Sequence, residues 1–335
     1  MTAEAAAVAA AQGGDEAAFR TLTEPYAREL HVHCYRMLGS IQDAEDALQE
    51  TLLRAWRHLA RFEPRGPFRA WLYKIATNVC LSAASRRSTE SIPYPMTAEG
   101  EALVRTPYPD AWLDELRTEP AVRYDLHESV QIAFLAAIQV LPARQRAVLL
   151  LRDVLGFPAS EVADLIGSST AGVNSALQRA RAGLDRWRAE GRLAIGRAPA
   201  PDDVQQSLLR RYVEAWDAID IDGLVAVLRE DAVMTMPPSP LIFHGRAAIG
   251  EFFATVPAEG ALDQIRLVPT RANGQPAVAA YLLDQEAGIY RGYGLMVLTI
   301  DGEKVAEITG FTDPALFSMF GLPAELSSSP DGAAP

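Results

Sequence analysis

Two proline-containing segments divide this chain of 335 residues into three parts, and they constrain its fold more than any other feature. The first, 89–126, contains five prolines and more acidic than basic residues; the second, 191–203, reads GRLAIGRAPAPDD. Proline lacks a backbone N–H and its ring clashes with the preceding helical turn, so neither segment continues a helix. We expect both to be linkers, the first with little regular structure.

The parts between these breaks differ in hydrophobic periodicity. Apolar residues recur at helical spacing in 15–88 and 127–190, whereas 204–322 begins with an amphipathic helix and continues with alternating segments such as IYRGYGLMVLTI. The expected fold is therefore multidomain: two all-α helical domains, the second with a helix-turn-helix, followed by an α+β domain. The end of the chain, 323–335, is polar and rich in serine, proline and alanine, and we expect it to be disordered.

The segment 157–188 has the pattern of a helix-turn-helix. Gly167 ends a first short helix, and Ser169 can cap a second one, TAGVNSALQRARAGLDRW. On the second helix an apolar stripe leaves the opposite face small and polar, followed by arginines, as suits a helix in the DNA major groove. The alternative is a plain helical hairpin with a solvated basic face. The residues expected at DNA are Ser169, Thr170, Ala171, Asn174, Ser175, Gln178, Arg179 and Arg181.

The first helical part carries an acidic stripe and a cationic, aromatic block. Asp43, Asp46 and Glu50 share one helix face beside Leu48 and Leu52, a pattern that is also typical of a merely solvated face. The block 61–80 alternates Arg or Lys with aromatic residues around the loop EPRGP. Cations can hold a nucleic-acid backbone while aromatic pockets receive unstacked bases. The alternative is an amphipathic helix whose aromatic residues, Trp71 and Tyr73 among them, are core.

Three long motifs in this order resemble the extracytoplasmic-function sigma factors of the sigma-70 family. GSIQDAEDALQETLLRAW resembles region 2.2, FRAWLYKIATNVCLSAASRR resembles regions 2.3 and 2.4, and LPARQRAVLLLRDVLGFPASEVADLIGSSTAGVNSALQRARAGL resembles region 4. The resemblance implies a bacterial protein that binds core RNA polymerase and directs promoter recognition and transcription initiation. The acidic linker would thread toward the catalytic channel of the polymerase.

The same resemblance assigns roles to individual residues. The helix from Thr170 would read the minus-thirty-five element of the promoter. The residues that would contact the polymerase are Asp43, Asp46, Gln49, Glu50 and Leu53. Those that would open and read the minus-ten element are Arg61, Phe62, Arg65, Phe68, Arg69, Trp71, Lys74 and Asn78.

The last part, 204–322, resembles the SnoaL-like family of cone-shaped α+β domains, some of which are isomerases, hydrolases or cyclases. A catalytic member would need a carboxylate or His inside the pocket, and the candidates are Asp217, Asp231, His244, Asp284 and Asp313. Because no two of them form a recognisable dyad, we expect no enzymatic activity. We expect a regulatory domain, acting through protein contacts or through a small-molecule ligand in its pocket.

Two other functions remain open at this stage. A ligand-sensing, DNA-binding regulator would explain the helix-turn-helix and the last domain, but not the acidic stripe or the block 61–80. A SnoaL-like isomerase or hydrolase with helical adaptor domains is the second. Strong promoter binding without polymerase would favour the first alternative, and turnover by 204–322 would favour the second.

The charge distribution indicates an intramolecular contact. The chain has a net charge of −12, but 53–87 contains eight basic residues and one acid, whereas 205–322 contains eight basic residues and fifteen acids. These segments therefore carry +7 and −7. Opposite charges on one chain point to separate partners or to each other. We expect the last domain to dock on the helical body, with the block 53–87 as its basic partner. The alternative is that the charges only keep two independent domains soluble.

Composition places the protein in the cytoplasm, without cofactor or metal. The longest apolar stretch is too short to span a bilayer, and MTAEAAAVAAAQGG is a poor signal peptide. Two cysteines, Cys34 and Cys80, fit a reducing compartment. His31 and His33 beside Cys34 have metal-ligand chemistry, but two positions apart on a helix they face different directions.

Overall fold

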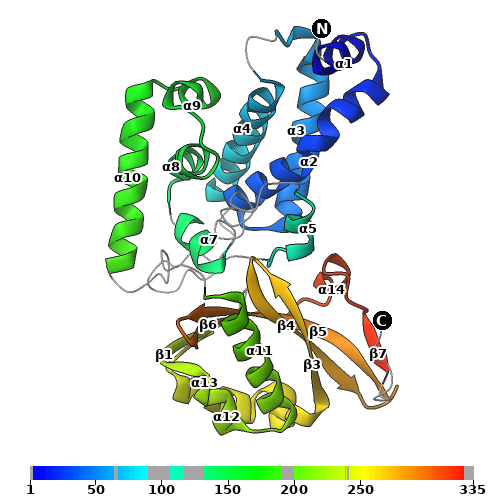
Figure 1. Cartoon of the computed structure of the whole chain (residues 1–335), viewed down its shortest axis with the longest axis vertical. Helices are drawn as coiled ribbons and strands as arrows, with labels where there is room; N and C mark the ends of the chain where they lie inside the picture. Colours follow the sequence, from blue (N-terminus) through cyan, green and yellow to red (C-terminus); the bar gives the residue numbers. More distant parts are fainter. Residues whose placement is uncertain are drawn as a thin grey trace.

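The structure is a computed structural model, and it describes residues 3–63, 67–89, 106–116, 131–139, 141–189, 200–237, 239 and 241–327. Helices form the upper part of the molecule in Figure 1, and a sheet with its own helices forms the lower part. The upper helices are α1 (Ala3–Gln12), α2 (Glu16–Leu38), α3 (Ile41–His58), η1 (Leu59–Arg61), α4 (Phe68–Thr89), α5 (Asp110–Asp114), α7 (Ile132–Gln139), α8 (Ala143–Leu149), the π-helical turn η2 (Leu150–Val154), α9 (Ala159–Ile166) and α10 (Thr170–Ala189).

Capping residues set the boundaries of the first helices. The Asp15 carboxylate accepts hydrogen bonds from the Ala17 and Ala18 N–H groups and begins α2. Gly39 ends α2 in the left-handed conformation, and Ser40 caps α3 by accepting a hydrogen bond from the Asp43 N–H. The first unit also extends beyond the predicted boundary of residue 15, because Gln12 at the end of α1 donates to the Leu59 and Phe62 carbonyls.

The helix-turn-helix is confirmed. Helix α9 ends at Gly167, again left-handed, and Ser169 accepts a hydrogen bond from the Gly172 N–H at the start of α10. Val173, Leu177 and Ala180 are buried at helical spacing along α10, as the sequence predicts.

A buried arginine joins the two helical units. The Arg146 guanidinium, on α8, donates to the carbonyls of Met37 at the end of α2 and of Ile138, Gln139 and Leu141 around α7. Gln139 in turn donates to the Arg36 carbonyl at 3.1 Å. The end of α2 is therefore hydrogen-bonded to the second helical unit, and the two units form one packed body.

The last domain contains α11 (Asp202–Asp217), α12 (Ile221–Ala226), α13 (Arg246–Thr255), two 3-10 turns, η3 (Pro257–Gly260) and η4 (Leu262–Gln264), α14 (Leu316–Met319) and one sheet. Its strands are β1 (Leu228–Thr235), β2 (Ile242–His244), β3 (Ile265–Ala272), β4 (Gln275–Asp284), β5 (Ile289–Asp301), β6 (Lys304–Phe311) and β7 (Glu325–Ser327). The sheet order is β2-β1-β6-β5-β4-β3, with β7 paired to β5. Only β1 and β6 pair in parallel among the described strands.

The sheet buries both faces because its strands alternate two sets of apolar side chains. One set, including Val278 and Leu298, packs with Leu208, Tyr212 and Trp216 of α11 and Phe253 of α13. These helices cover that face (Figure 1). The other set, including Ala277, Ala279 and Tyr281 of β4, belongs to the same continuous core as the helical units above.

Two predicted disordered segments are partly structured. In the linker 89–126, residues 106–116 contain the helix α5, and Tyr108 and Leu113 are fully buried. Prolines at 107 and 109 hold this segment extended before α5, so they shape it and do not prevent packing. In the tail, Glu325–Ser327 pairs with β5 as strand β7. Residues 90–105, 117–126 and 328–335 of these segments lie outside the described residues, as does most of 191–203.

Two buried histidines predict a loss of stability in mild acid. Burial, with Arg28 nearby, lowers the pKa of His31 to about 4, and burial, with Arg36 and Arg69 nearby, lowers the pKa of His33 to about 3. His31 is hydrogen-bonded to the Tyr108 hydroxyl, and His33 to the Thr77 hydroxyl.

As the pH falls below about 6.5, the unfolded chain takes up these protons first, so the free energy of unfolding must fall toward the lowered pKa values. Each histidine contributes up to about 1.4 kcal/mol per pH unit. Urea titrations between about pH 7.5 and 5.5 should show this loss of free energy of unfolding. A constant free energy of unfolding across this range would contradict the prediction.

Candidate nucleic-acid, polymerase and regulatory sites

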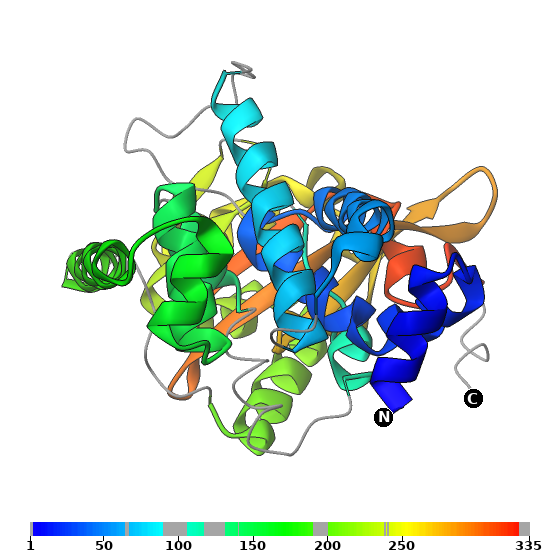
Figure 2. The same cartoon turned by 90° about the horizontal axis from the view of Figure 1, so that it is seen from above.

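All of the side chains predicted to read the minus-thirty-five element are exposed. They form one face of α10, which lies at the outer edge of the helical body in both views (Figures 1 and 2). Arg181 is held there by Asp153, with nitrogen–oxygen distances of 2.9 and 2.7 Å. The structure brings together Ser169, Thr170, Ala171, Asn174, Ser175, Gln178, Arg179 and Arg181.

The acidic stripe on α3 also lies at the surface. Asp46 and Gln49 are exposed, Asp43 and Glu50 are half-buried, and the Glu50 carboxylate accepts a hydrogen bond from Arg54 at 2.6 Å. Leu53, at the end of the stripe, is 42% exposed and places an apolar side chain beside the carboxylates. The stripe therefore combines carboxylates with an exposed apolar side chain, a composition suited to a protein contact.

The aromatic residues of the predicted minus-ten set are mainly core residues, which corrects one expectation. Phe62 and Phe68 are buried, and Trp71 is half-buried. The centroids of these three rings lie 4.9 to 5.5 Å apart. Ring packing of this kind removes large apolar areas from water. In this conformation the alternative, an amphipathic helix with core aromatics, is right for Phe62, Phe68 and Tyr73.

The polar members of the minus-ten set are divided between surface and packing. Arg61 and Lys74 are exposed. Arg69 donates to the Glu29 carboxylate at 2.9 Å and lies over the Tyr73 ring. Burial alone would lower the pKa of Arg69, but the hydrogen bond to Glu29 and the neighbouring Tyr73 outweigh it and raise this pKa. Arg65 lies outside the described residues.

Residues of this set also contact the helix-turn-helix. The Arg69 guanidinium lies 5.5 Å from the centre of the Phe157 ring, and Asn78 donates to the Leu165 carbonyl of α9 at 3.2 Å. The residues expected at the two promoter elements therefore belong to one packed body in this conformation.

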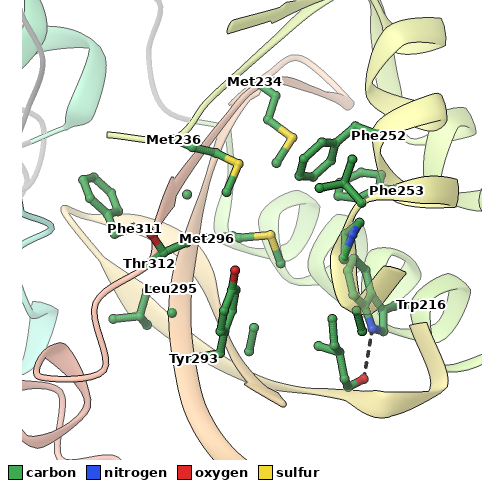
Figure 3. A pocket seen from close by; sticks show the side chains of 17 residues that line it. Trp216, Met234, Met236, Phe252, Phe253, Tyr293, Leu295, Met296, Phe311 and Thr312 are labelled. Atoms are coloured by element: carbon green, nitrogen blue, oxygen red, sulfur yellow. Dashed lines mark hydrogen bonds between the residues drawn. The ribbon is translucent and has the colours of Figure 1, made fainter. Parts of the chain in front are cut away.

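The cone of the last domain contains a cavity of about 110 Å³. Figure 3 shows the side chains that line it, which come from both the helices and the strands. None of the five candidate catalytic residues, all of them described, is among these lining residues. Asp231 pairs with Arg229, Asp284 pairs with Arg291, and Asp313 accepts from the Ala315 N–H. The hydrogen bonds from Arg229 and from Arg291 lower the pKa values of Asp231 and Asp284.

Sequence reasoning missed the site that joins the last domain to the helical body. The turn between β3 and β4 inserts Asn273, fully buried and at φ +58°, against the linker. Its side-chain oxygen accepts from the Tyr108 N–H at 2.8 Å, its side-chain nitrogen donates to the Tyr35 hydroxyl at 3.0 Å, and its backbone N–H donates to the Tyr108 carbonyl. We call this turn, Arg271–Gly274 of the sequence, the docking turn.

Asp110 of the linker completes the contact. Its carboxylate accepts from the Gly274 N–H at 2.7 Å and from Arg271 at 3.1 Å. The Asn273-Gly274 pair is a recognisable turn signal, but nothing local indicates what the turn contacts.

The predicted site of docking is wrong. The sequence indicated that the acidic last domain would bind the basic block 53–87. The hydrogen bonds of the docking turn go instead to the linker and α2, and the charges are reversed, with the base on the last domain and the acid on the linker. Net charge describes a domain as a whole, whereas docking follows the shape and hydrogen-bonding groups of one surface.

The described residues offer no group of three or more His, Cys, Asp or Glu side chains that could hold a metal ion. His31 and His33 do point to different neighbours, Tyr108 and Thr77. Among the described helices, none is long and apolar enough to cross a membrane.

Comparison with known proteins assigns each part of this architecture. Residues 22–90 match Sigma-70 region 2, residues 131–184 match Sigma-70, region 4, and residues 209–308 match the SnoaL-like domain. The crystal structure of the Mycobacterium tuberculosis extracytoplasmic function sigma factor SigJ has a TM-score of 0.61 at 23% identity, covering 88% of this chain and 97% of that one. The fold is shared with SigJ.

Sequence relatives agree with these matches. The ECF RNA polymerase sigma factor SigG of Mycobacterium tuberculosis is 42% identical over 320 residues, covering 92% of this chain and 85% of SigG. The probable ECF RNA polymerase sigma factor SigI of the same species is 27% identical over 291 residues, covering 84% of this chain and 88% of SigI.

The protein is thus a transcription initiation factor of the sigma-70 type, carrying a SnoaL-like domain. It belongs to the extracytoplasmic-function (ECF) RNA polymerase sigma factors. It binds core RNA polymerase and promoter DNA, directs transcription initiation, and is not an enzyme.

Proposed function

We propose that this sigma factor acts in the cytoplasm, contacts polymerase through the stripe on α3 and reads promoters through α10 and the surface of α4. The observation that carries the assignment is the exposure of two separate, chemically distinct faces on one helical body. The α3 face presents carboxylates and Leu53, whereas the α10 face presents amides, hydroxyls and arginines.

The contact to polymerase predicts a charge-reversal phenotype. Replacing Asp46 and Glu50 together with Lys turns attractive contacts with a basic partner surface into repulsive ones. Each change should cost on the order of 1–3 kcal/mol of binding where the contact is partly buried. Pull-down of core polymerase should therefore be reduced about tenfold or more in the double variant.

A matched control separates this effect from net charge. Glu214→Lys with Glu251→Lys changes the charge by the same amount at exposed positions on α11 and α13. It should retain wild-type binding to core polymerase. If both double variants capture core polymerase equally well, the α3 stripe is not part of the interface with polymerase.

On α10 we propose a division of labour between bases and phosphates. Asn174 and Gln178 carry amides that can pair with adenine edges, whereas Arg179 and Arg181 carry charges that suit phosphates. Arg181 is already paired with Asp153 on the surface. We therefore propose that Arg179 contributes more than Arg181 to binding the DNA phosphates.

Gln178→Ala should change the preferred minus-thirty-five sequence without changing the dependence of binding on salt. Arg179→Ala should weaken binding to all promoters alike. It should also reduce, by about one unit, the slope of the logarithm of the binding constant against the logarithm of the salt concentration. Arg181→Ala should act in the same direction but less strongly. A promoter library bound by the holoenzyme at several salt concentrations measures both quantities. If Gln178→Ala and Arg179→Ala behave alike, the division of roles is wrong.

We further propose that the SnoaL-like domain restrains the sigma body through the docking turn. Promoter elements named for positions −10 and −35 lie roughly 25 base pairs apart, or about 85 Å along DNA at about 3.4 Å per base pair. Reading both requires the contacts of Asn78 and Arg69 with the helix-turn-helix to separate. The docking turn also holds Tyr108 and Asp110, which belong to the linker that must be freed for the polymerase.

Asn273→Gly tests this restraint with little risk to the turn. Glycine accepts φ +58° but removes the side-chain hydrogen bonds to Tyr108 and Tyr35. Losing two buried hydrogen bonds costs about 1–3 kcal/mol, equivalent to roughly a five- to hundredfold shift toward the open state. Run-off transcription with core polymerase should increase, and the increase should depend only weakly on salt because most of these contacts are between neutral groups.

The matched control is Gly288→Asn in the turn between β4 and β5, a left-handed position with open space around its Cα. It should leave transcription unchanged. Unchanged or lower transcription by a folded Asn273→Gly protein would contradict the proposal that the docking turn restrains the sigma body.

A further inference from the structure

The cavity in the cone of the SnoaL-like domain has walls of unusual composition. Three methionines, Met234 on β1, Met236 just after it and Met296 on β5, direct their side chains into it (Figure 3). Opposite them lie Trp216 of α11 and the neighbouring Phe252 and Phe253 of α13. Thioethers are polarisable and adapt their shape, and they make favourable contacts with aromatic rings. The walls therefore favour an aromatic guest.

The cavity offers an ionised guest no partner. No charged side chain is among the residues that line it, all of which the structure describes. The Trp216 indole N–H donates to the Ile265 carbonyl at 3.1 Å, so this ring presents its apolar surface to the cavity. Moving an ion from water into such a site without a compensating charge is costly. The guest must therefore be uncharged.

Hydroxyl groups lie only at one end of the cavity. Tyr293, which is 45% exposed, and Thr312, which is also exposed, carry them. Val256, which also lines the cavity, is 56% exposed. An entrance lined by exposed apolar groups and two hydroxyls admits a molecule with one polar substituent and orients that substituent outward.

Volume limits the size of the guest. A cavity of about 110 Å³ is somewhat smaller than an engineered cavity of about 150 Å³ that binds benzene. We propose that the cone cavity binds an uncharged monocyclic aromatic molecule, of the class of simple phenols, with its ring against the methionines and its hydroxyl toward Tyr293 and Thr312. This ligand site is independent of the proposed docking of the domain, since it concerns binding alone.

Two matched probes test the chemistry of the site. 4-Methylphenol and 4-hydroxybenzoate differ in a methyl and a carboxylate group. Calorimetric titration of the full chain should give a dissociation constant on the order of 0.1–1 mM for 4-methylphenol. Binding of 4-hydroxybenzoate should be at least about tenfold weaker, because its carboxylate has no charged partner in the cavity.

Two variants locate the site. A Cβ at Gly310 would meet the Met236 side chain at 3.5 Å, an ordinary contact, so Gly310→Ala fits without displacing backbone and takes space from the cavity. It should weaken binding of 4-methylphenol about fivefold or more. Glu303→Ala, at an exposed position in the turn between β5 and β6 and outside the cavity lining, should bind as the wild type does. Met236→Ala, at a half-buried position, enlarges the cavity and should bind 2-naphthol more tightly than the wild type.

Circular dichroism and thermal unfolding without ligand establish that each variant is folded. Selective binding of 4-methylphenol, weakened by Gly310→Ala and retained by Glu303→Ala, supports the site. Absence of 4-methylphenol binding up to about 10 mM, or equal binding of the carboxylate, overturns the ligand class. Binding that is indifferent to both Gly310→Ala and Met236→Ala overturns the location.

Discussion

The compact arrangement of this sigma factor depends on the buried guanidinium of Arg146. A buried charge is tolerated only when its hydrogen-bonding groups are satisfied, and Arg146 donates to backbone carbonyls at the end of α2 and around α7. The Met37 and Gln139 carbonyls lie in the last turns of α2 and α7, where carbonyls have no intrahelical donor. One side chain thus satisfies groups from both helical units, and truncating it would leave several carbonyls unpaired at once. The same two units also pack against each other through α4 and α9.

The second junction, the docking turn, has a different character. Its hydrogen bonds centre on Asn273, whose amide side chain and backbone bind Tyr108 and Tyr35, with an ion pair from Arg271 to Asp110 beside it. One apolar face of the sheet packs on the helical body beside this turn. Arg271 is 41% exposed, so the ion pair contributes little, and the neutral hydrogen bonds carry the contact. The few hydrogen bonds of the docking turn can be broken at modest cost, whereas separating the two helical units must also break the hydrogen bonds of Arg146. We therefore place any regulation by the SnoaL-like domain at the docking turn.

The aromatic residues in and just before α4 show why local patterns have limits. Alternation of cations with aromatic side chains indicated a surface for unstacked bases, yet Phe62 and Phe68 are buried. Sequence periodicity identifies a helix but cannot tell how many of its faces are covered. Here α4 is packed by α2, α3, α8 and α9, so nearly every large side chain on it meets a neighbour. For α3 and α10, which keep one face uncovered, the predicted surface residues are at the surface.

The sequence by itself determined the order of the domains, the helix-turn-helix with its glycine stop and serine cap, and the family, because caps, periodicity and motif spacing are local properties. It also determined which faces of α3 and α10 are polar. Only the tertiary structure decided that the linker packs through Tyr108, that the last domain docks through Asn273, and that the candidate carboxylates lie outside the cone cavity. These outcomes depend on which surfaces meet across more than 160 residues of sequence, as the separation of 165 between Tyr108 and Asn273 illustrates, and no local pattern encodes such a meeting.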